Sequence, residues 1–130
     1  MTQKKAILCV DDEKIVLDAL KEQLTANFGY RYIYEVAENA QEAWEVIEDL
    51  SEEGVTLLLI VSDWLMPGIR GDEFLIQVHE KFPSISKIML TGQADPKAMA
   101  NAEQNANLKA CLLKPWNEQE LVQIIQSALE

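Results

Sequence analysis

The amino-acid sequence predicts an α/β protein built on a doubly wound, five-stranded parallel sheet with five helices. The first supporting observation is its size, because 130 residues of which 48% are hydrophobic suit one domain with a single sizeable core. The second is that short apolar runs of strand length occur five times, each followed by a segment with helical spacing of apolar residues. Short connections between such strands are right-handed crossovers, which place helices on both faces of the sheet.

The predicted strands are the apolar runs at residues 6–10, 32–37, 57–62, 87–90 and 110–113. Four of these runs are nearly continuous, which is typical of strands that are buried on both faces of a parallel sheet. Only the run at 32–37, YIYEVA, alternates between apolar and polar residues. It is therefore the predicted edge strand.

The predicted helices each carry one apolar stripe toward the sheet. The stripes are Val16, Leu20 and Leu24; Ala40, Trp44 and Ile47; Leu75, Val78 and Phe82; and Leu121, Ile124 or Ile125, and Ala128. Start signals precede three helices, with Asn39 and Glu42, Asn117 and Glu120, and Asp95 and Pro96. The segment 96–107 has only Ala98, Met99 and Ala102 as an apolar face, so we expect it to be the most loosely held helix.

Composition excludes several functions. The net charge of -11 disfavours a nucleic-acid surface, which needs clustered Lys and Arg. The apolar run ILCV near the start is too short for a signal peptide or membrane span, so we expect a cytoplasmic protein without membrane contact. Cys9 and Cys111 lie in apolar segments without CxxC spacing, and we expect two buried, reduced thiols.

The candidate functional residues lie where the predicted strands end. Ligands of open parallel sheets bind at the carboxyl ends of the strands. The residues in that position are Asp11, Asp12 and Glu13 after the first strand, Asp63 after the third, Thr91 and Gly92 after the fourth, and Lys114 and Pro115 after the fifth.

The chemistry of this set predicts a site for a divalent cation and a phosphoryl group. Asp11, Asp12 and Asp63 would repel one another unless a cation joined them or their pKa values rose. Oxygen ligands without histidine or thiolate favour Mg²⁺, with Mn²⁺ as the second choice. Thr91 and Lys114 supply a hydroxyl donor and a positive charge for phosphoryl oxygens, so Asp63 could act as a nucleophile.

The same constellation resembles the signature of response-regulator receiver domains, the phosphoacceptor half of two-component signalling. The motifs are DDE at 11–13, Asp63 in SDWLMPGIRG, TG at 91–92 and KP at 114–115. The resemblance covers essentially the whole chain, and it implies one receiver domain at 1–130 with a flavodoxin-like sheet of strand order 2-1-3-4-5. It also implies a signalling module, not an enzyme, that takes a phosphoryl group from a sensor histidine kinase or a phosphotransfer protein.

The resemblance implies a role for each site residue. Asp63 matches the phosphoacceptor, and Asp12 and Asp63 match the direct Mg²⁺ ligands, with Asp11 reaching the metal through water. The backbone carbonyl of Leu65 matches the third protein ligand. Thr91 matches the switch hydroxyl. Lys114 matches the phosphate-binding lysine, whose bond to the following proline is expected to be cis.

The chain departs from the family pattern at one position. Relatives commonly carry Tyr or Phe three residues before the lysine, where this chain has Cys111. Because a thiol buries much less area than a ring, we expect coupling between the site and the surface either to be weaker or to run through other residues. Leu65 and Gln93 stand at the positions that tune attack by water, and Leu65 cannot orient water, so we expect a longer phosphoryl lifetime than in fast chemotaxis relatives.

Two other functions compete with phosphorylation-driven signalling. One is a phosphorylation-independent binding module, which the complete acidic, Thr and Lys set disfavours. The other is a Mg²⁺-dependent aspartyl phosphatase, which would need an acid at the position of Leu65. The expected partners are the kinase or phosphotransfer protein and a downstream effector domain or protein, and the sequence leaves open whether phosphorylation also makes a homodimer. The sequence leaves open whether the domain acts alone or within a larger protein.

Three further residues, His79, Trp44 and Trp116, are not assigned to the site. We expect His79 on the exposed side of its helix without a catalytic role, and Trp44 in core packing. Trp116 fits either packing or partner contact.

Overall fold

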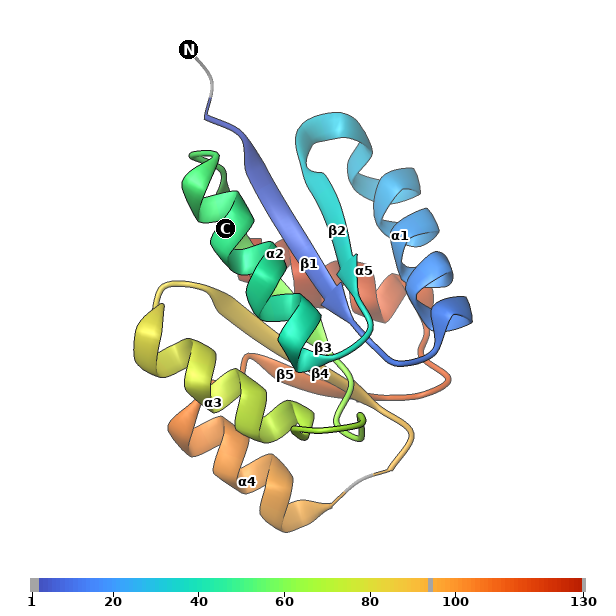
Figure 1. The fold of residues 1–130 in the computed structure, drawn as a ribbon. Helices are drawn as coiled ribbons and strands as arrows, with labels where there is room; N and C mark the ends of the chain where they lie inside the picture. The colour runs from blue at the N-terminus through green and yellow to red at the C-terminus, as the bar shows by residue number, and fades with distance from the viewer. Residues whose placement is uncertain (1–2, 94, 130) are drawn as a thin grey trace.

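The computed structural model describes residues 3–93 and 95–129, and Figure 1 shows its layers. Strands and helices alternate along the chain. The elements are β1 Lys5–Val10, α1 Lys14–Phe28, the 3-10 helix η1 Gly29–Arg31, β2 Ile33–Ala37, α2 Ala40–Glu52, β3 Thr56–Ser62, α3 Gly71–Lys81, β4 Ser86–Thr91, α4 Pro96–Asn105, β5 Ala110–Leu113 and α5 Glu118–Leu129. The five strands are parallel in the order β2-β1-β3-β4-β5, which confirms the predicted fold class and strand order.

Two apolar layers cover the two faces of the sheet. Successive side chains of a strand point to opposite faces. Leu8, Ile60 and Met89 therefore face α2, α3 and α4, while Ile7 and Ile88 face α1 and α5. Figure 1 shows α1 and α5 on one side of the sheet and α2, α3 and α4 on the other.

The predicted helix start signals are confirmed. Asn39 Oδ1 accepts a hydrogen bond from the backbone N–H of Glu42 at 2.8 Å, and Asn117 Oδ1 accepts one from Glu120 at 3.0 Å. Asp95 caps α4, with Pro96 at its first turn. Each cap satisfies an N–H that has no partner inside its helix, so the helix begins at a defined residue.

Some sequence expectations need correction. The buried stripe of α1 includes Leu17 and Phe28, whereas Val16 is half-buried. The run at 110–113 was expected to be buried on both faces, but β5 is an edge strand and its Leu113 is exposed. His79 was expected on the exposed side of its helix, but it is half-buried.

The side chain of His79 contacts a buried lysine. Lys87 lies in β4 and is only 1% exposed, and its Nζ lies 2.9 Å from Nδ1 of His79 on α3. Burial, followed by the charge of Lys109, lowers the pKa of Lys87 to about 8.

Within residues 3–93 and 95–129, no helix combines the length and the apolar character that a membrane crossing requires.

Candidate functional site

Asp63 stands at the end of the central strand β3. Its backbone N–H donates to the carbonyl of Val10 at 2.8 Å, which continues the pairing of β3 with β1 by one residue. The hydroxyl of Ser62 donates to the carbonyl oxygen of Asp63 at 2.9 Å, and Asp63 Oδ1 accepts the N–H of Trp64 at 2.9 Å. The buried strand and these bonds fix both the backbone and the carboxylate of Asp63.

The turn after Asp63 depends on two glycines. Gly68 has a φ of 88°, in the region that favours glycine. Gly71 donates its N–H to the carbonyl of Trp64 at 2.6 Å, and a methyl group added at Gly71 would overlap the backbone carbonyl of Asp63. A glycine at position 71 therefore lets α3 begin directly beside the carboxyl end of β3.

Three carboxylates gather at this edge of the sheet. Asp11, Asp12 and Asp63 each offer an oxygen, and these oxygens lie within 4.8 Å of one another. Asp11 and Asp63 are buried and Asp12 is exposed. Asp11 Oδ1 accepts the N–H of Glu13 at 2.9 Å, which fixes this carboxylate at the start of the loop. The predicted convergence of the three acids is confirmed.

Lys114 enters the same site from the end of β5. Its backbone N–H donates to the carbonyl of Thr91 at 2.8 Å, and its peptide bond to Pro115 is cis, as expected. Its Nζ donates to Asp11 Oδ2 at 2.6 Å and lies 3.4 Å from Asp63 Oδ1. Burial acts to lower the pKa of Lys114, but the hydrogen bond to Asp11 and the charges of both acids outweigh it, so the pKa is raised.

The carboxyl group of Asp63 is harder to ionise than an exposed aspartate. Burial, and then the charge of Asp11, raise the pKa of Asp63 from 3.8 to about 6, although Lys114 and the Trp64 N–H act to lower it. The ammonium group of Lys114 therefore offsets only part of the effect of burial and of the Asp11 charge on Asp63.

Thr91 and Gln93 complete the pocket around Asp63. The Thr91 hydroxyl donates to the carbonyl of Gln93 at 3.1 Å and accepts the Gln93 N–H at 3.2 Å. The Asp63 pocket has a volume of about 230 Å³ and is lined by Asp12, Glu13, Asp63, Leu65, Thr91, Gly92, Gln93 and Lys114. The side chains that were predicted for the site belong to residues that line this pocket or form the acidic cluster, and Leu65, whose backbone carbonyl was the predicted ligand, also lines the pocket.

The acidic cluster fits a divalent cation. Its donors are carboxylate oxygens, the ligands that Mg²⁺ prefers, and they lie within 4.8 Å of one another. A dication would also offset the two effects that raise the pKa of Asp63, which are burial and then the charge of Asp11.

A buried contact beside the site was not predicted from the sequence. Asp72 is 1% exposed, and its Oδ1 accepts hydrogen bonds from Trp64 Nε1 at 3.0 Å and Arg70 Nε at 3.2 Å. Trp64 directly follows Asp63, so this contact holds the first residue of the turn. The sequence feature that could have indicated this contact is an acidic residue in the first turn of α3, directly after a glycine.

The position that departs from the family pattern makes a sulfur contact. Cys111 Sγ lies 3.0 Å from Met99 Sδ, so the thiol of β5 touches α4. Cys111 is half-buried, whereas full burial was expected, and Cys9 is fully buried.

Trp116 donates from Nε1 to Gln23 Oε1 at 2.8 Å, which favours the packing role for this residue.

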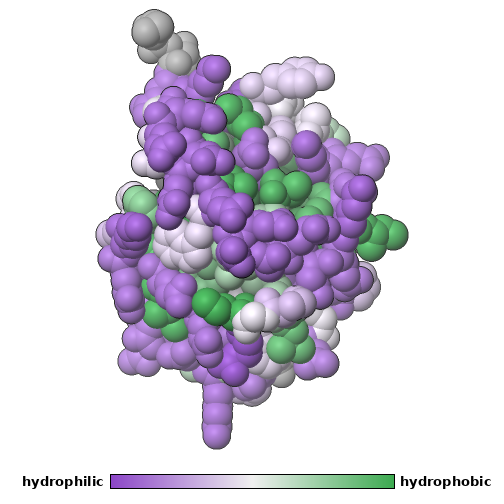
Figure 2. Space-filling view, in the orientation of Figure 1, coloured by the Kyte–Doolittle hydropathy of each residue, from purple (hydrophilic) through white to green (hydrophobic). Residues whose placement is uncertain are grey.

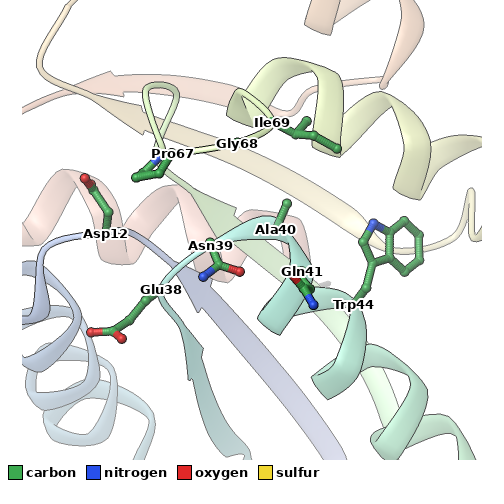
Figure 3. Close-up of a pocket in the computed structure, with 9 residues that line it drawn as sticks. All are labelled: Asp12, Glu38, Asn39, Ala40, Gln41, Trp44, Pro67, Gly68 and Ile69. Carbon is green, nitrogen blue, oxygen red and sulfur yellow. The ribbon is translucent and has the colours of Figure 1, made fainter.

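A larger hollow than the Asp63 pocket adjoins the acidic cluster but is not centred on Asp63. It has a volume of about 660 Å³ and shares Asp12 with the Asp63 pocket. Figure 3 shows Asp12 and Glu38 toward one end and Trp44 toward the other. Of the connection from β3 to α3, Pro67 lies near Asp12 and Ile69 lies at the Trp44 end. Its chemistry differs from that of the Asp63 pocket because the described residues that line it include no threonine or lysine.

Comparison with known proteins agrees with the geometry of the site. Residues 7–126 match the family described as the response regulator receiver domain. The hydrogenase transcriptional regulatory protein HoxA of Cupriavidus necator is 32% identical, and the match covers 100% of this chain and 25% of that protein. A chemotaxis protein CheY homolog of Campylobacter jejuni is 27% identical, with coverage of 95% of this chain and 91% of that protein. The chain spans 25% to 32% of the lengths of three matched transcriptional regulatory proteins.

Solved structures share the fold over nearly the whole chain. The signal receiver domain of an HD domain-containing protein from Pseudomonas fluorescens superimposes with a TM-score of 0.86 at 29% identity, covering 99% of this chain and 89% of that one. A CheY-like response regulator receiver domain protein from Methanospirillum hungatei has a TM-score of 0.83 at 31% identity, with coverage of 98% and 94%.

Proposed function

The chain belongs to the response regulator receiver domain family, and we propose that residues 1–130 form one receiver domain that accepts a phosphoryl group on Asp63. The observation that carries this proposal is the convergence of Asp11, Asp12, Asp63, Thr91 and Lys114 on one pocket from the ends of four strands. The proposed donor is a sensor histidine kinase or a phosphotransfer protein in the cytoplasm.

In the proposed reaction, Asp63 is the nucleophile. The Trp64 N–H and Lys114 both approach Oδ1, so we assign the attack to Oδ2. Oδ2 forms a bond to phosphorus while the bond between phosphorus and the donor's histidine ring nitrogen breaks, and the ring nitrogen keeps the electron pair. Asp63 must be deprotonated for this attack, which the positive charge of Lys114 favours.

The other residues would hold the phosphoryl oxygens and the metal. Lys114 Nζ, 3.4 Å from Asp63 Oδ1, is near enough to pair with a phosphoryl oxygen once the group is attached. Asp12, Asp63 and the Leu65 carbonyl would hold Mg²⁺ directly, with Asp11 acting through water and Mn²⁺ as an alternative ion. The bound ion would neutralise negative charge on the carboxylates and the phosphoryl group.

Thr91 is the proposed link between the site and the surface. Its hydroxyl donates to the Gln93 carbonyl, a bond that it can exchange for one to a phosphoryl oxygen. That exchange would release the connection from β4 to α4 and bias the domain toward a second conformation. The contact between Cys111 and Met99 joins β5 to α4, so it is the proposed route for this change where relatives use an aromatic ring.

The output is proposed to lie outside these 130 residues. An effector domain of a longer protein, an effector protein, or a second copy of the chain would read the altered surface. Net turnover of a substrate is not expected, because the position of Leu65 offers no acid to assist a leaving group.

Intact-mass analysis after incubation with acetyl phosphate and Mg²⁺ tests this function. We expect a gain of one phosphoryl group, its loss in Asp63→Asn and without Mg²⁺, and no loss in Asp18→Asn, which changes an exposed acid on α1. If the protein binds Mg²⁺, seen as quenching of Trp64 fluorescence, but gains no phosphoryl group, the phosphorylation-independent binding module becomes the better account.

A further inference from the structure

A second surface of the molecule has the features of a docking groove. The hollow of about 660 Å³ described above is followed along α2 by another of about 450 Å³, and Trp44 lines both. We call the two hollows together the Trp44 groove. In Figure 2 the surface between α2 and α3 carries pale and green residues among hydrophilic ones.

The floor of this groove is apolar and firmly held. The Trp44 ring packs edge to face on Phe74 with the ring centroids 5.9 Å apart. The ring of Phe82 is tilted relative to Trp44, with its centroid 6.4 Å from that of Trp44. Lys81 Nζ lies 5.6 Å from the Trp44 centroid. Ile69 adds a half-buried aliphatic side chain beside the indole. A rigid aromatic side chain with one part buried and one part facing a hollow is typical of the anchor sites of protein interfaces.

The rim of the groove is acidic. Asp12 and Glu38 line the larger hollow, and Glu48 and Glu80 line the smaller. Lys81 is the one basic residue among the described residues that line either hollow. Four acids against one base disfavour phosphate-bearing partners such as nucleic acid or an anionic membrane, and they favour a cationic one.

The length of the groove indicates the size of its occupant. Its lining runs along α2 from Ala40 to Glu48, which is about 12 Å at 1.5 Å per helical residue. About four residues of extended chain cover that distance at about 3.3 Å each. Two hollows joined by an aromatic floor suit alternate side chains of an extended segment, with apolar ones inward and basic ones on the rim.

We propose that the Trp44 groove docks a short, extended, basic peptide segment of a partner protein, in which Leu-like side chains contact Trp44 and Ile69 and Lys or Arg side chains pair with the acidic rim. Docking does not depend on phosphoryl transfer to Asp63, because the groove lies outside the Asp63 pocket. Asp12 is the residue that both share, so the test is made without added Mg²⁺ to leave this carboxylate free.

The test is an NMR titration of the ¹⁵N-labelled protein with a six-residue peptide of alternating Arg and Leu. We expect saturable shifts of the Trp44 indole N–H and of the backbone amides around the groove. The double charge reversal Glu38→Lys with Glu80→Lys should weaken binding about tenfold, as the loss of two exposed ion pairs predicts. Both residues are exposed, so the fold should survive.

The controls separate this groove from general attraction to an acidic protein. Glu22→Lys, an exposed acid on α1, should leave the affinity within about twofold, since rim charges act locally. An alternating Glu and Leu peptide should not bind. Equal weakening by Glu22→Lys, shifts elsewhere on the surface, or binding of arginine amide as tight as that of the peptide would overturn the proposal.

Discussion

Replacing Asp63 with asparagine should stabilise the metal-free protein at neutral pH. The carboxylate is buried beside Asp11, and its pKa is raised from 3.8 to about 6 by burial and then by that neighbouring charge. Asparagine removes the charge but keeps an Oδ1 that can accept the Trp64 N–H. The contact that is lost is the 3.4 Å approach of Lys114, which is the weaker of the two ion pairs of that lysine.

The shift in the pKa of Asp63 sets the magnitude. A rise from 3.8 to about 6 corresponds to about 3 kcal/mol at 1.36 kcal/mol per pKa unit. The pocket opens to solvent beside Asp12, which screens part of this cost, so we expect a gain of about 2 kcal/mol in the free energy of unfolding of Asp63→Asn.

The gain should depend on pH with a defined sign. Between about pH 4 and pH 6 the folded protein holds a proton on Asp63 that the unfolded chain has released, so the stability of the unmodified protein falls as the pH rises through this window. The advantage of Asp63→Asn is therefore full above pH 6, about half as large at pH 5 and absent below pH 4.

Urea unfolding in the presence of EDTA at pH 7.5 and pH 5 measures this difference. Asp18→Asn serves as the control, because it removes one negative charge from the exposed face of α1. Equal stability of Asp63→Asn and the unmodified protein at pH 7.5, or an advantage that is the same at both pH values, would refute the electrostatic description of the site.

Three further substitutions test other parts of the structure. Gly71→Ala should cost about 3 kcal/mol of unfolding free energy in urea and abolish phosphorylation, because its methyl group would overlap the carbonyl of Asp63; normal stability would contradict this. Lys87→Met should raise the free energy of unfolding by about 2 kcal/mol at pH 7, because the pKa of this buried amine is lowered to about 8. The unfolded chain keeps that proton up to about pH 10.5, so the gain in stability should shrink between pH 8 and 10.5. Urea unfolding at pH 7 and 9.5 measures this change, and an equal gain at both pH values would contradict the lowered pKa of Lys87. Cys111→Tyr should change the affinity of the phosphorylated domain for its output partner, and unchanged affinity in calorimetry would remove position 111 as a control point.

The sequence predicted the fold and the main site because both depend on local patterns. Continuous apolar runs specify strands that are buried on both faces, and the residue after each run must lie at the carboxyl edge of a parallel sheet. That rule alone brings Asp11, Asp63 and Lys114 together. The details of their contacts, such as the stronger pairing of Lys114 with Asp11, depend on side-chain geometry that no pattern specifies.

The features that the sequence did not predict arise from packing between segments. Lys87 lies in a strand pattern that gives no sign of its contact with His79 eight residues earlier. Trp44 has helical spacing that fits a core residue, and one part of its ring does pack on Phe74, yet it also lines the groove. The relative placement of α2 and α3 leaves this groove open, and such placement depends on the whole set of contacts with the sheet.

The most direct test of the central claim is to map the phosphoryl group to a residue. The domain is treated with acetyl phosphate and Mg²⁺, then reduced with borohydride, which converts an aspartyl phosphate into homoserine, and digested for tandem mass spectrometry. We predict homoserine at position 63 alone and none in the sample without Mg²⁺. Homoserine at Asp11, Asp12 or Asp72, or at no position in a protein that binds Mg²⁺, would contradict the assignment of Asp63 as the phosphoacceptor.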